Sequence, residues 1–154
     1  FVIYLNLGWS ILSGGLTLAA MILPTIVRTS EEAIRAVPNA YREISYALGA
    51  TRWQTVTSAV LPTALPGIAT GVILAIGRSI GETAAVLFTA GASLRLPESL
   101  LDPVRTLPVH FYILAREGIS MENAYGTATV LIVLVLAINF AAYSIMGQLA
   151  ARGK

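Results

Sequence analysis

The sequence predicts an all-α protein that is embedded in a membrane. Of its 154 residues, 56% are hydrophobic and only 12% are charged, whereas about a quarter of the residues in a typical soluble domain are charged. The hydrophobic residues gather in three stretches, residues 1–27, 63–92 and 124–150. Each stretch is long enough to cross a bilayer, because a transmembrane helix needs about 20 residues.

The composition argues against several other classes of protein. The chain has no cysteine, so it has no disulfide framework and no thiolate metal site. Its one histidine, His110, cannot build a metal cluster alone and is expected to be a packing or surface residue. A net charge of +2 is too small for a nucleic-acid-binding surface. We therefore expect no metal, no cofactor and no nucleic-acid partner.

The first stretch, residues 1–27, is too long and too rich in polar residues and glycine for a signal peptide. Because the chain starts at Phe1, without Met and within apolar sequence, we expect further helices to precede it. Pro24 falls in the predicted last turn and would kink the helix there. Small residues four apart let helices pack closely in lipid. Two such pairs occur here: Ser10 with Gly14, and Gly15 with Ala19.

The basic residues predict the orientation. The segment 28–62 and the tail 151–154 together hold six basic residues, and the segment 93–123 holds three. Basic residues are enriched in cytoplasmic loops. The segment 28–62 and the tail are therefore predicted to be cytoplasmic, and the segment 93–123 to be outside.

The cytoplasmic segment is predicted to fold into short helices. Thr29 and Glu32 have the spacing of a capping box, which would start a helix that ends before Pro38. Pro38 would open the next helix at its first turn, and Gly49 would end it.

A second capping box follows, with Thr51 as the cap and Gln54 as its partner. The helix that it starts leads into "LPTALP", where Pro62 and Pro66 mark the return into the membrane.

The helix before Gly49 carries an apolar strip with Arg42 and Glu43 beside it. The strip consists of Tyr41, Ile44, Ala47 and Leu48. Such a helix can lie in a groove on a partner protein, or it can rest on lipid headgroups. The residues alone leave both alternatives open.

The outer segment 93–123 is predicted to contain a short amphipathic helix. Its apolar residues recur three and four apart, at Val104, Leu107, Phe111 and Leu114. We expect this helix to lie on the membrane surface or to cover an outer vestibule.

Two charges, Arg78 and Glu82, interrupt the second apolar stretch. They are four residues apart and would share one face of a continuous helix. An unpaired charge at the bilayer centre costs about 2.5–3.5 kcal/mol even on the most lenient scale. The charges are therefore either a structural ion pair or part of a substrate path. A substrate path is favoured, because a buried ion pair is weak evidence for stability.

The cytoplasmic segment resembles the EAA loop of ABC importer permeases. The stretch "EISYALGATRWQTVTSAVLP" matches that pattern at Glu43, Gly49, Leu61 and Pro62, and it departs from the pattern at Ile44, Ser45 and Ala59. In these permeases the loop inserts a coupling helix into a cytoplasmic ATPase subunit. The resemblance therefore implies coupling residues at Tyr41, Arg42, Glu43, Ala47, Gly49 and Ala50.

Nearly the whole chain is similar to PstA-type permeases of bacterial phosphate ABC importers. The similarity rests on "VRTSEEAIRAVPNAYRE", "ALGATRWQTV", "IGETAAVLFTAG", "LPVHFYILA" and "AYGTATVLIVLVLAIN". It implies an ABC importer permease fold in the bacterial cytoplasmic (inner) membrane. The implied partners are two ATP-binding subunits, a related PstC-like permease and an outer phosphate-binding protein.

Phosphate suits the residues in the second stretch. The guanidinium fork of Arg78 matches phosphate oxygens and stays charged. Glu82 could occupy Arg78 when phosphate is absent and repel the anion as it leaves. Ser79 and Thr83 could donate hydroxyl hydrogen bonds.

Two rival functions remain. The first is import of another solute, such as molybdate, sulfate or a polar organic molecule. The second is a membrane scaffold or sensor that docks a partner without passing solute, although such a protein has no need of charge at the membrane centre. An enzyme is disfavoured, because the sequence has no nucleophile–base set. It also lacks a phosphate-binding loop, so any ATP hydrolysis belongs to a partner.

Overall fold

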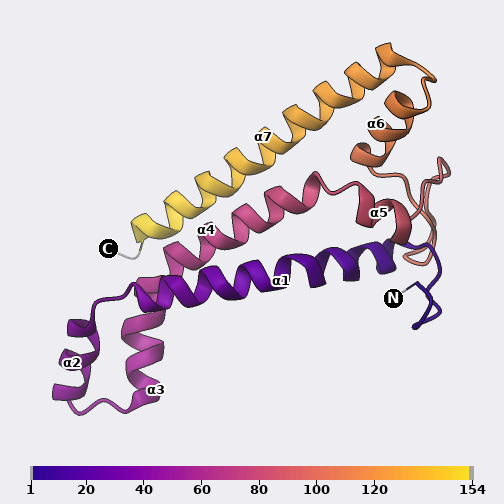
Figure 1. Ribbon diagram of the computed structural model, residues 1–154. Coiled ribbons are helices and arrows are strands. Elements are labelled where there is room, and N and C mark those ends of the chain that lie inside the picture. Colours follow the sequence, from indigo (N-terminus) through magenta and orange to yellow (C-terminus); the bar gives the residue numbers. More distant parts are fainter. Residues whose placement is uncertain (1, 153–154) are drawn as a thin grey trace. The chain divides into compact units, whose positions relative to one another are not determined.

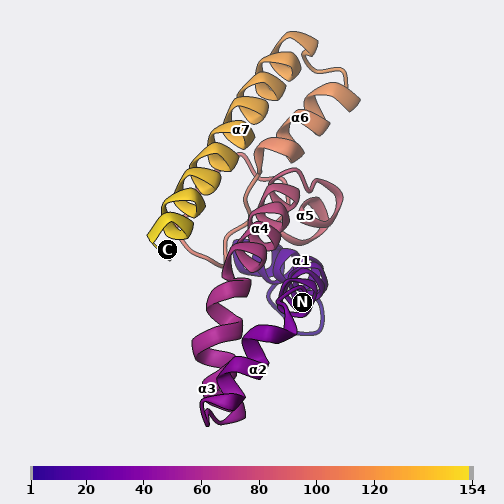
Figure 2. The same cartoon turned by 90° about the vertical axis from the view of Figure 1, so that its left-hand side faces the viewer.

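A computed structural model describes the backbone of residues 2–152, with the side chains of Ile145 and of residues 148–152 outside the description. Its described part contains helices and no strand (Figures 1 and 2). In chain order the elements are α1 (Ile11–Arg35), α2 (Asn39–Ala47), α3 (Arg52–Thr55), the π-helix η1 (Val56–Val60), α4 (Leu61–Ile80), α5 (Ala84–Thr89), α6 (Leu107–Arg116) and α7 (Met121–Arg152).

Among the described residues, three helical stretches are long and apolar enough to cross a membrane: Ile11–Arg35, Arg52–Ile80 and Met121–Ser144. The prediction of an all-α membrane protein with three spans is therefore confirmed. The predicted cytoplasmic tail lies largely outside the described residues, since only the backbone of residues 151 and 152 is described.

The first span starts later than the sequence predicted. Residues 2–10 are turns and irregular backbone, and α1 begins at Ile11. Asn6 and Gly8 have φ values of 54° and 60°, which a right-handed helix does not allow. The hydroxyl of Ser10 then accepts a hydrogen bond from Ser13 N at 3.1 Å, as an N-terminal cap does. Ser10 therefore caps the helix and does not belong to its packing face.

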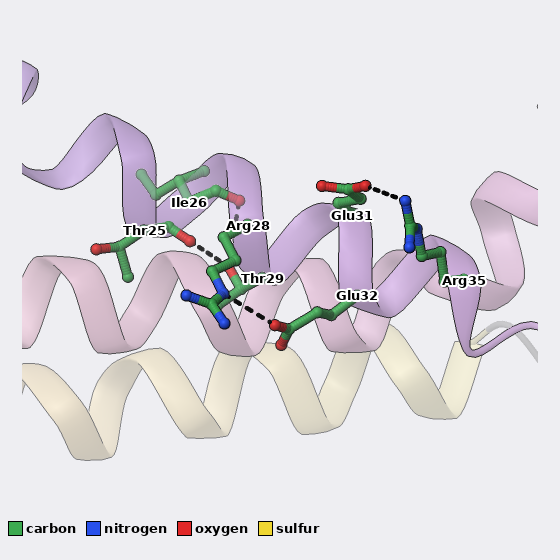
Figure 3. Close-up of polar contacts among 7 residues, drawn as sticks. All are labelled: Thr25, Ile26, Arg28, Thr29, Glu31, Glu32 and Arg35. Atoms are coloured by element: carbon green, nitrogen blue, oxygen red, sulfur yellow. Dashed lines mark hydrogen bonds and ion pairs between the residues drawn. The ribbon is translucent and has the colours of Figure 1, made fainter.

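The predicted helix start at Thr29 is wrong, because α1 continues through it to Arg35. The Thr29 hydroxyl donates to Thr25 O at 2.9 Å, a bond typical of threonine inside a helix. Glu32 pairs instead with Arg28 at 3.2 Å (Figure 3). This pair is exposed and four residues apart, and such a pair is worth about 0.3–0.5 kcal/mol. Pro24 likewise lies inside α1 and not in its last turn.

The second span is helical from Arg52 to Ile80, but it contains one π-helical turn, η1. The N–H of Leu61 donates to Val56 O, five residues back. Pro62 follows directly, lacks an N–H and crowds the carbonyl four residues before it. The wider turn accommodates this proline, so Pro62 and Pro66 both lie within α4.

The chain divides into two compact units, which are considered separately. The unit of residues 23–75 and 140–152 contains the contact between the end of α1 and α4. A Cβ at Gly67 would lie 2.8 Å from the Ala33 Cβ, and a Cβ at Gly71 would lie 2.7 Å from the Thr29 Cβ. Both glycines therefore allow direct helix contact. The contact continues into a small core of Val37, Val60 and Ala64, with Ala33 and Ile68 packed against it.

The other unit, residues 2–22 and 76–139, has its core around α5 and α6. Val86, Ala90 and Val109 are buried together there. The predicted amphipathic helix exists as α6, and Leu114 of its predicted apolar stripe is buried. The other buried residues of α6 are Pro108 and Val109, which the stripe did not include. Phe111, which was predicted to lie on the apolar face, is 37% exposed. Val104 precedes the helix and packs against the same core.

Carbonyl groups of this unit satisfy the first amides of α1. Ser10 N donates to Thr89 O at 3.1 Å, and Ile11 N donates to Asp102 O at 3.0 Å. The carboxylate of Asp102 holds the loop by accepting the N–H groups of Glu98 and Ser99, each at 2.8 Å. These two bonds lower the pKa of Asp102, and the charge of nearby Arg95 adds a smaller lowering.

We predict that Gly71→Ala destabilises the protein, because the new Cβ would overlap the Thr29 side chain. Overpacking of this kind costs roughly 1–3 kcal/mol. Gly15→Ala is the matched control, because no atom lies within 4 Å of its added Cβ. The measurement is thermal unfolding of both purified variants in detergent. Equal midpoints for the two variants would contradict the packing.

We predict that the Asp102 loop stays ordered in mild acid. The pKa of Asp102 is lowered in the folded state. The contribution of its carboxylate to stability is therefore fully present above the unfolded pKa of about 3.9, and it is lost as the pH falls through the lower folded pKa. Hydrogen exchange of the Ile11 amide should therefore stay slow at pH 4. In Asp102→Asn this amide should exchange faster at pH 7. Identical exchange in the two proteins would contradict the role of the carboxylate.

Candidate functional site

The two charges of the second apolar stretch do not share a helix face. Arg78 lies in the last turn of α4, which ends at Ile80, and Glu82 lies in the break before α5. The ion pairs among the described residues are Arg28–Glu32 and Glu31–Arg35, so Arg78 and Glu82 form none. The predicted pairing is therefore wrong, because the helix on which it depended ends between the two residues.

The Glu82 side chain instead bonds to the first turn of α5. Its carboxylate accepts a long hydrogen bond of 3.5 Å from Ala85 N, three residues later. Carboxylates at this position satisfy amides that have no partner inside the helix. Glu82 therefore helps to start α5 after the break at residues 81–83.

The hydroxyls beside the break bond to their own backbone. Ser79 Oγ donates to Ile76 O at 2.8 Å, and Thr83 Oγ1 approaches Gly81 O at 3.4 Å. The Arg78 side chain is exposed. It is free to bind an anion directly, whereas the hydroxyls would have to rotate away from their present acceptors.

Asn139 of α7, which was not among the predicted site residues, also approaches this end of α4. Its Oδ1 would lie 3.1 Å from a Cβ at Gly77, and its Nδ2 would lie 3.7 Å away. Gly77 directly precedes Arg78. The signal in the sequence was an amide side chain within the apolar run "VLIVLVLAINFAAYS".

The predicted coupling residues lie on and after α2, and α2 lies beside α3 and η1 (Figures 1 and 2). No residue of α2 is buried. Tyr41, Glu43 and Ala47 are exposed and available to a partner. Arg42 differs, since it donates to Ile34 O at 3.0 Å and to Asn39 Oδ1 at 2.8 Å. Arg42 therefore ties α2 to the end of α1.

The turn after α2 is a helix C-terminal motif that depends on Gly49. Gly49 has a φ of 81°, a region that favours glycine. Its N–H donates to Tyr46 O at 2.9 Å, and the N–H of Ala50 donates to Ser45 O at 3.0 Å. These two bonds define a Schellman motif, which confirms that Gly49 ends α2.

The capping box of Thr51 and Gln54 is also confirmed. Gln54 N donates to Thr51 Oγ1 at 3.3 Å, and Thr51 N donates to Gln54 Oε1 at 2.9 Å. The turn between α2 and α3 is therefore held on both sides. It supports exposed apolar side chains, among them Ile44, Leu48 and Trp53.

No group of three or more potential metal ligands (His, Cys, Asp or Glu) occurs among the described residues. His110 lies near Arg105, with 3.5 Å between His110 Nδ1 and Arg105 Nη1. Together with Asn123 and Thr127 it lines an open, mostly apolar cavity of about 410 Å³.

The chain is similar to known membrane transport proteins. It is 40% identical to the probable ABC transporter permease protein YqgI of Bacillus subtilis, over 92% of this chain and 54% of that protein. It is 39% identical to the phosphate transport system permease protein PstA 1 of Mycobacterium tuberculosis, over 82% of this chain and 43% of that protein. It is 38% identical to the probable phosphate transport system permease protein PstA of Methanocaldococcus jannaschii, over 84% of this chain and 47% of that protein.

No solved structure matches the chain. It spans about half the length of these three relatives. The family model of binding-protein-dependent transport system inner membrane components matches residues 1–153. The predicted resemblance to PstA-type permeases and the predicted membrane location are therefore confirmed. The chain belongs to the family of binding-protein-dependent transport system inner membrane components.

Proposed function

We propose that this chain is part of the permease subunit of an ABC importer that carries inorganic phosphate across the bacterial inner membrane. Support for the transport role comes from the family and from the three membrane-spanning helices. Support for phosphate comes from the relatives named as phosphate transport permeases, at 37–41% identity. ATP hydrolysis belongs to a partner subunit, since the sequence has no phosphate-binding loop.

The observation that carries the proposal is Arg78 at the end of a membrane helix. Its guanidinium is exposed beside a helix break. Irregular backbone at membrane depth is tolerated where it lines a cavity or is buried in protein, and charges within spans mark substrate paths. In the proposed path Arg78 binds the phosphate, and Ser79 and Thr83 supply further hydrogen bonds.

The role proposed for Glu82 differs from the one that the sequence suggested, in which Glu82 pairs with Arg78. Its carboxylate lies at the start of α5 and not on Arg78. We propose that its negative charge limits how strongly the region around Arg78 holds an anion. A carrier needs such a limit, because an ion must bind weakly enough to leave.

The proposed coupling element is the turn from α2 to α3. The segment 28–62 is predicted to be cytoplasmic. The exposed side chains of Tyr41, Ile44 and Leu48 in this element are therefore available to a cytoplasmic partner. An exposed apolar surface on a short, braced helix suits insertion into a groove. The proposed partners are two ATP-binding subunits. A PstC-like permease and an outer phosphate-binding protein complete the proposed importer.

The alternative is an importer of another oxyanion, because guanidinium and hydroxyl groups also bind sulfate and molybdate. Uptake of labelled phosphate into vesicles that contain the complete importer tests the proposal. Excess unlabelled phosphate should abolish the signal, while sulfate and molybdate should leave it unchanged. Uptake of sulfate or molybdate in place of phosphate would favour the alternative. Intact assembly without any uptake would favour a scaffold.

We predict that Arg78→Ala and Arg78→Lys both strongly reduce phosphate uptake, because lysine cannot form the two parallel bonds of a guanidinium. Arg105→Lys, in the outer segment, is the control and should transport normally. Assembly with the ATPase should be intact in all three variants, as measured by co-purification. Normal uptake by Arg78→Ala would disprove the assignment, and failed assembly would indicate a structural role.

We predict that Gly49→Val uncouples ATP hydrolysis from transport, because valine disfavours the φ of 81° between α2 and α3. Gly118→Val is the matched control, since Gly118 has a φ of 62° at the end of α6, in the outer segment. The measurement is ATPase stimulation by the loaded binding protein in reconstituted complexes. Gly49→Val should lose the stimulation and Gly118→Val should keep it. Equal stimulation in both variants would contradict the coupling role.

A further inference from the structure

Asn139 places a side-chain amide against the backbone of α4 within the membrane. It lies in the span Met121–Ser144, about 27 Å along α7 from Met121 at 1.5 Å per residue. A Cβ at Gly77 would be 3.1 Å from its Oδ1. A side chain at position 77 would press on this amide, so Gly77 allows the close approach of Asn139.

The hydroxyl groups of this span are satisfied within α7 at three positions. The hydroxyls of Thr127, Thr129 and Ser144 donate to carbonyls four residues earlier, at 2.8–2.9 Å. The Asn139 amide has no hydrogen bond to any described residue, although it is partly buried. A polar group in hydrocarbon without a partner costs several kcal/mol. The donors of the Asn139 amide are therefore not used by any described residue.

The position of Asn139 indicates which ligand it serves. Gly77 is adjacent in the chain to Arg78, and Cα atoms of neighbouring residues are about 3.8 Å apart. The Asn139 amide of α7 therefore approaches α4 at the position next to the one from which the Arg78 guanidinium extends. An amide NH₂ group offers two donors and no charge. It can bind an oxyanion without adding to the positive charge that would slow release.

We propose that Asn139 is a further residue of the oxyanion path, in which its Nδ2 donates to the anion held by Arg78. This inference rests on the proposed function, since it assumes that an oxyanion passes Arg78. The competing explanation is packing, because amides also hold membrane helices together by hydrogen bonds. The two explanations differ in what happens when the complex still assembles.

The experiment measures Asn139→Leu and Asn139→Asp in the complete importer. The first variant removes the donors at similar volume, and the second places a negative charge at the same site. Labelled phosphate uptake and ATP hydrolysis are measured in the same vesicles, after normalisation to assembled complex. Thr129→Val is the control, because the Thr129 hydroxyl bonds only to its own helix.

We expect Asn139→Leu to lower uptake roughly ten- to hundredfold, the worth of one hydrogen bond to a charged group. Asn139→Asp should lower it further, because its charge repels the anion. ATP hydrolysed per phosphate should rise in both variants, whereas a packing defect would lower hydrolysis and uptake together. The Thr129→Val control should behave as wild type.

Normal uptake by assembled Asn139→Leu would overturn the inference, and so would failure of this variant to assemble. A separate result would show that the proposed function is at fault. If the wild-type importer carries another oxyanion and no phosphate, the proposed substrate is wrong. The same variants, measured with that other anion, then decide the role of Asn139.

Discussion

The contact of Thr29 and Ala33 with Gly71 and Gly67 is the interaction on which the unit of residues 23–75 and 140–152 depends. Lipid is as apolar as a leucine side chain, so helices in a membrane associate through close packing and hydrogen bonds. The two glycines remove the side chains that would separate α1 from α4. The same surface continues into Val37, Val60 and Ala64, directly before and after the α2–α3 turn. Arg42 then ties α2 to Ile34 O at the end of α1. These contacts hold the start of α2 and the end of η1 against α1 and α4.

Two of the features proposed to carry function lie where a regular helix stops. The turn at Gly49 presents the exposed apolar side chains of α2, and the break at residues 81–83 lies beside Arg78. Backbone polar groups at such breaks need partners in a membrane. Glu82 supplies one at the start of α5, and the loop held by Asp102 supplies others at the start of α1. Local hydrogen bonds thus permit irregular backbone at these positions.

Two motifs in the sequence were misassigned because a spacing of three or four residues has more than one structural meaning. Thr29 and Glu32 have the spacing of a capping box, but the same spacing occurs inside a helix, where Thr29 bonds to Thr25 O and Glu32 pairs with Arg28. Arg78 and Glu82 are four apart, yet the helix ends between them. Thr51 and Gln54 were assigned correctly, because the left-handed Gly49 stops the preceding helix and leaves Thr51 at a true N-terminus.

The sequence by itself determined the properties that depend on composition and short-range pattern. These are the all-α membrane class, the three spans, the end of α2 at Gly49 and the capping box at Thr51. Only the tertiary structure decided which distant residues meet. In the tertiary structure Gly77 approaches Asn139 and Gly71 contacts Thr29. In α6, Val109 is buried where the sequence pattern had predicted Phe111. Periodicity reports which side of a helix is apolar, but contact between helices depends on their crossing and depth, which no local pattern encodes.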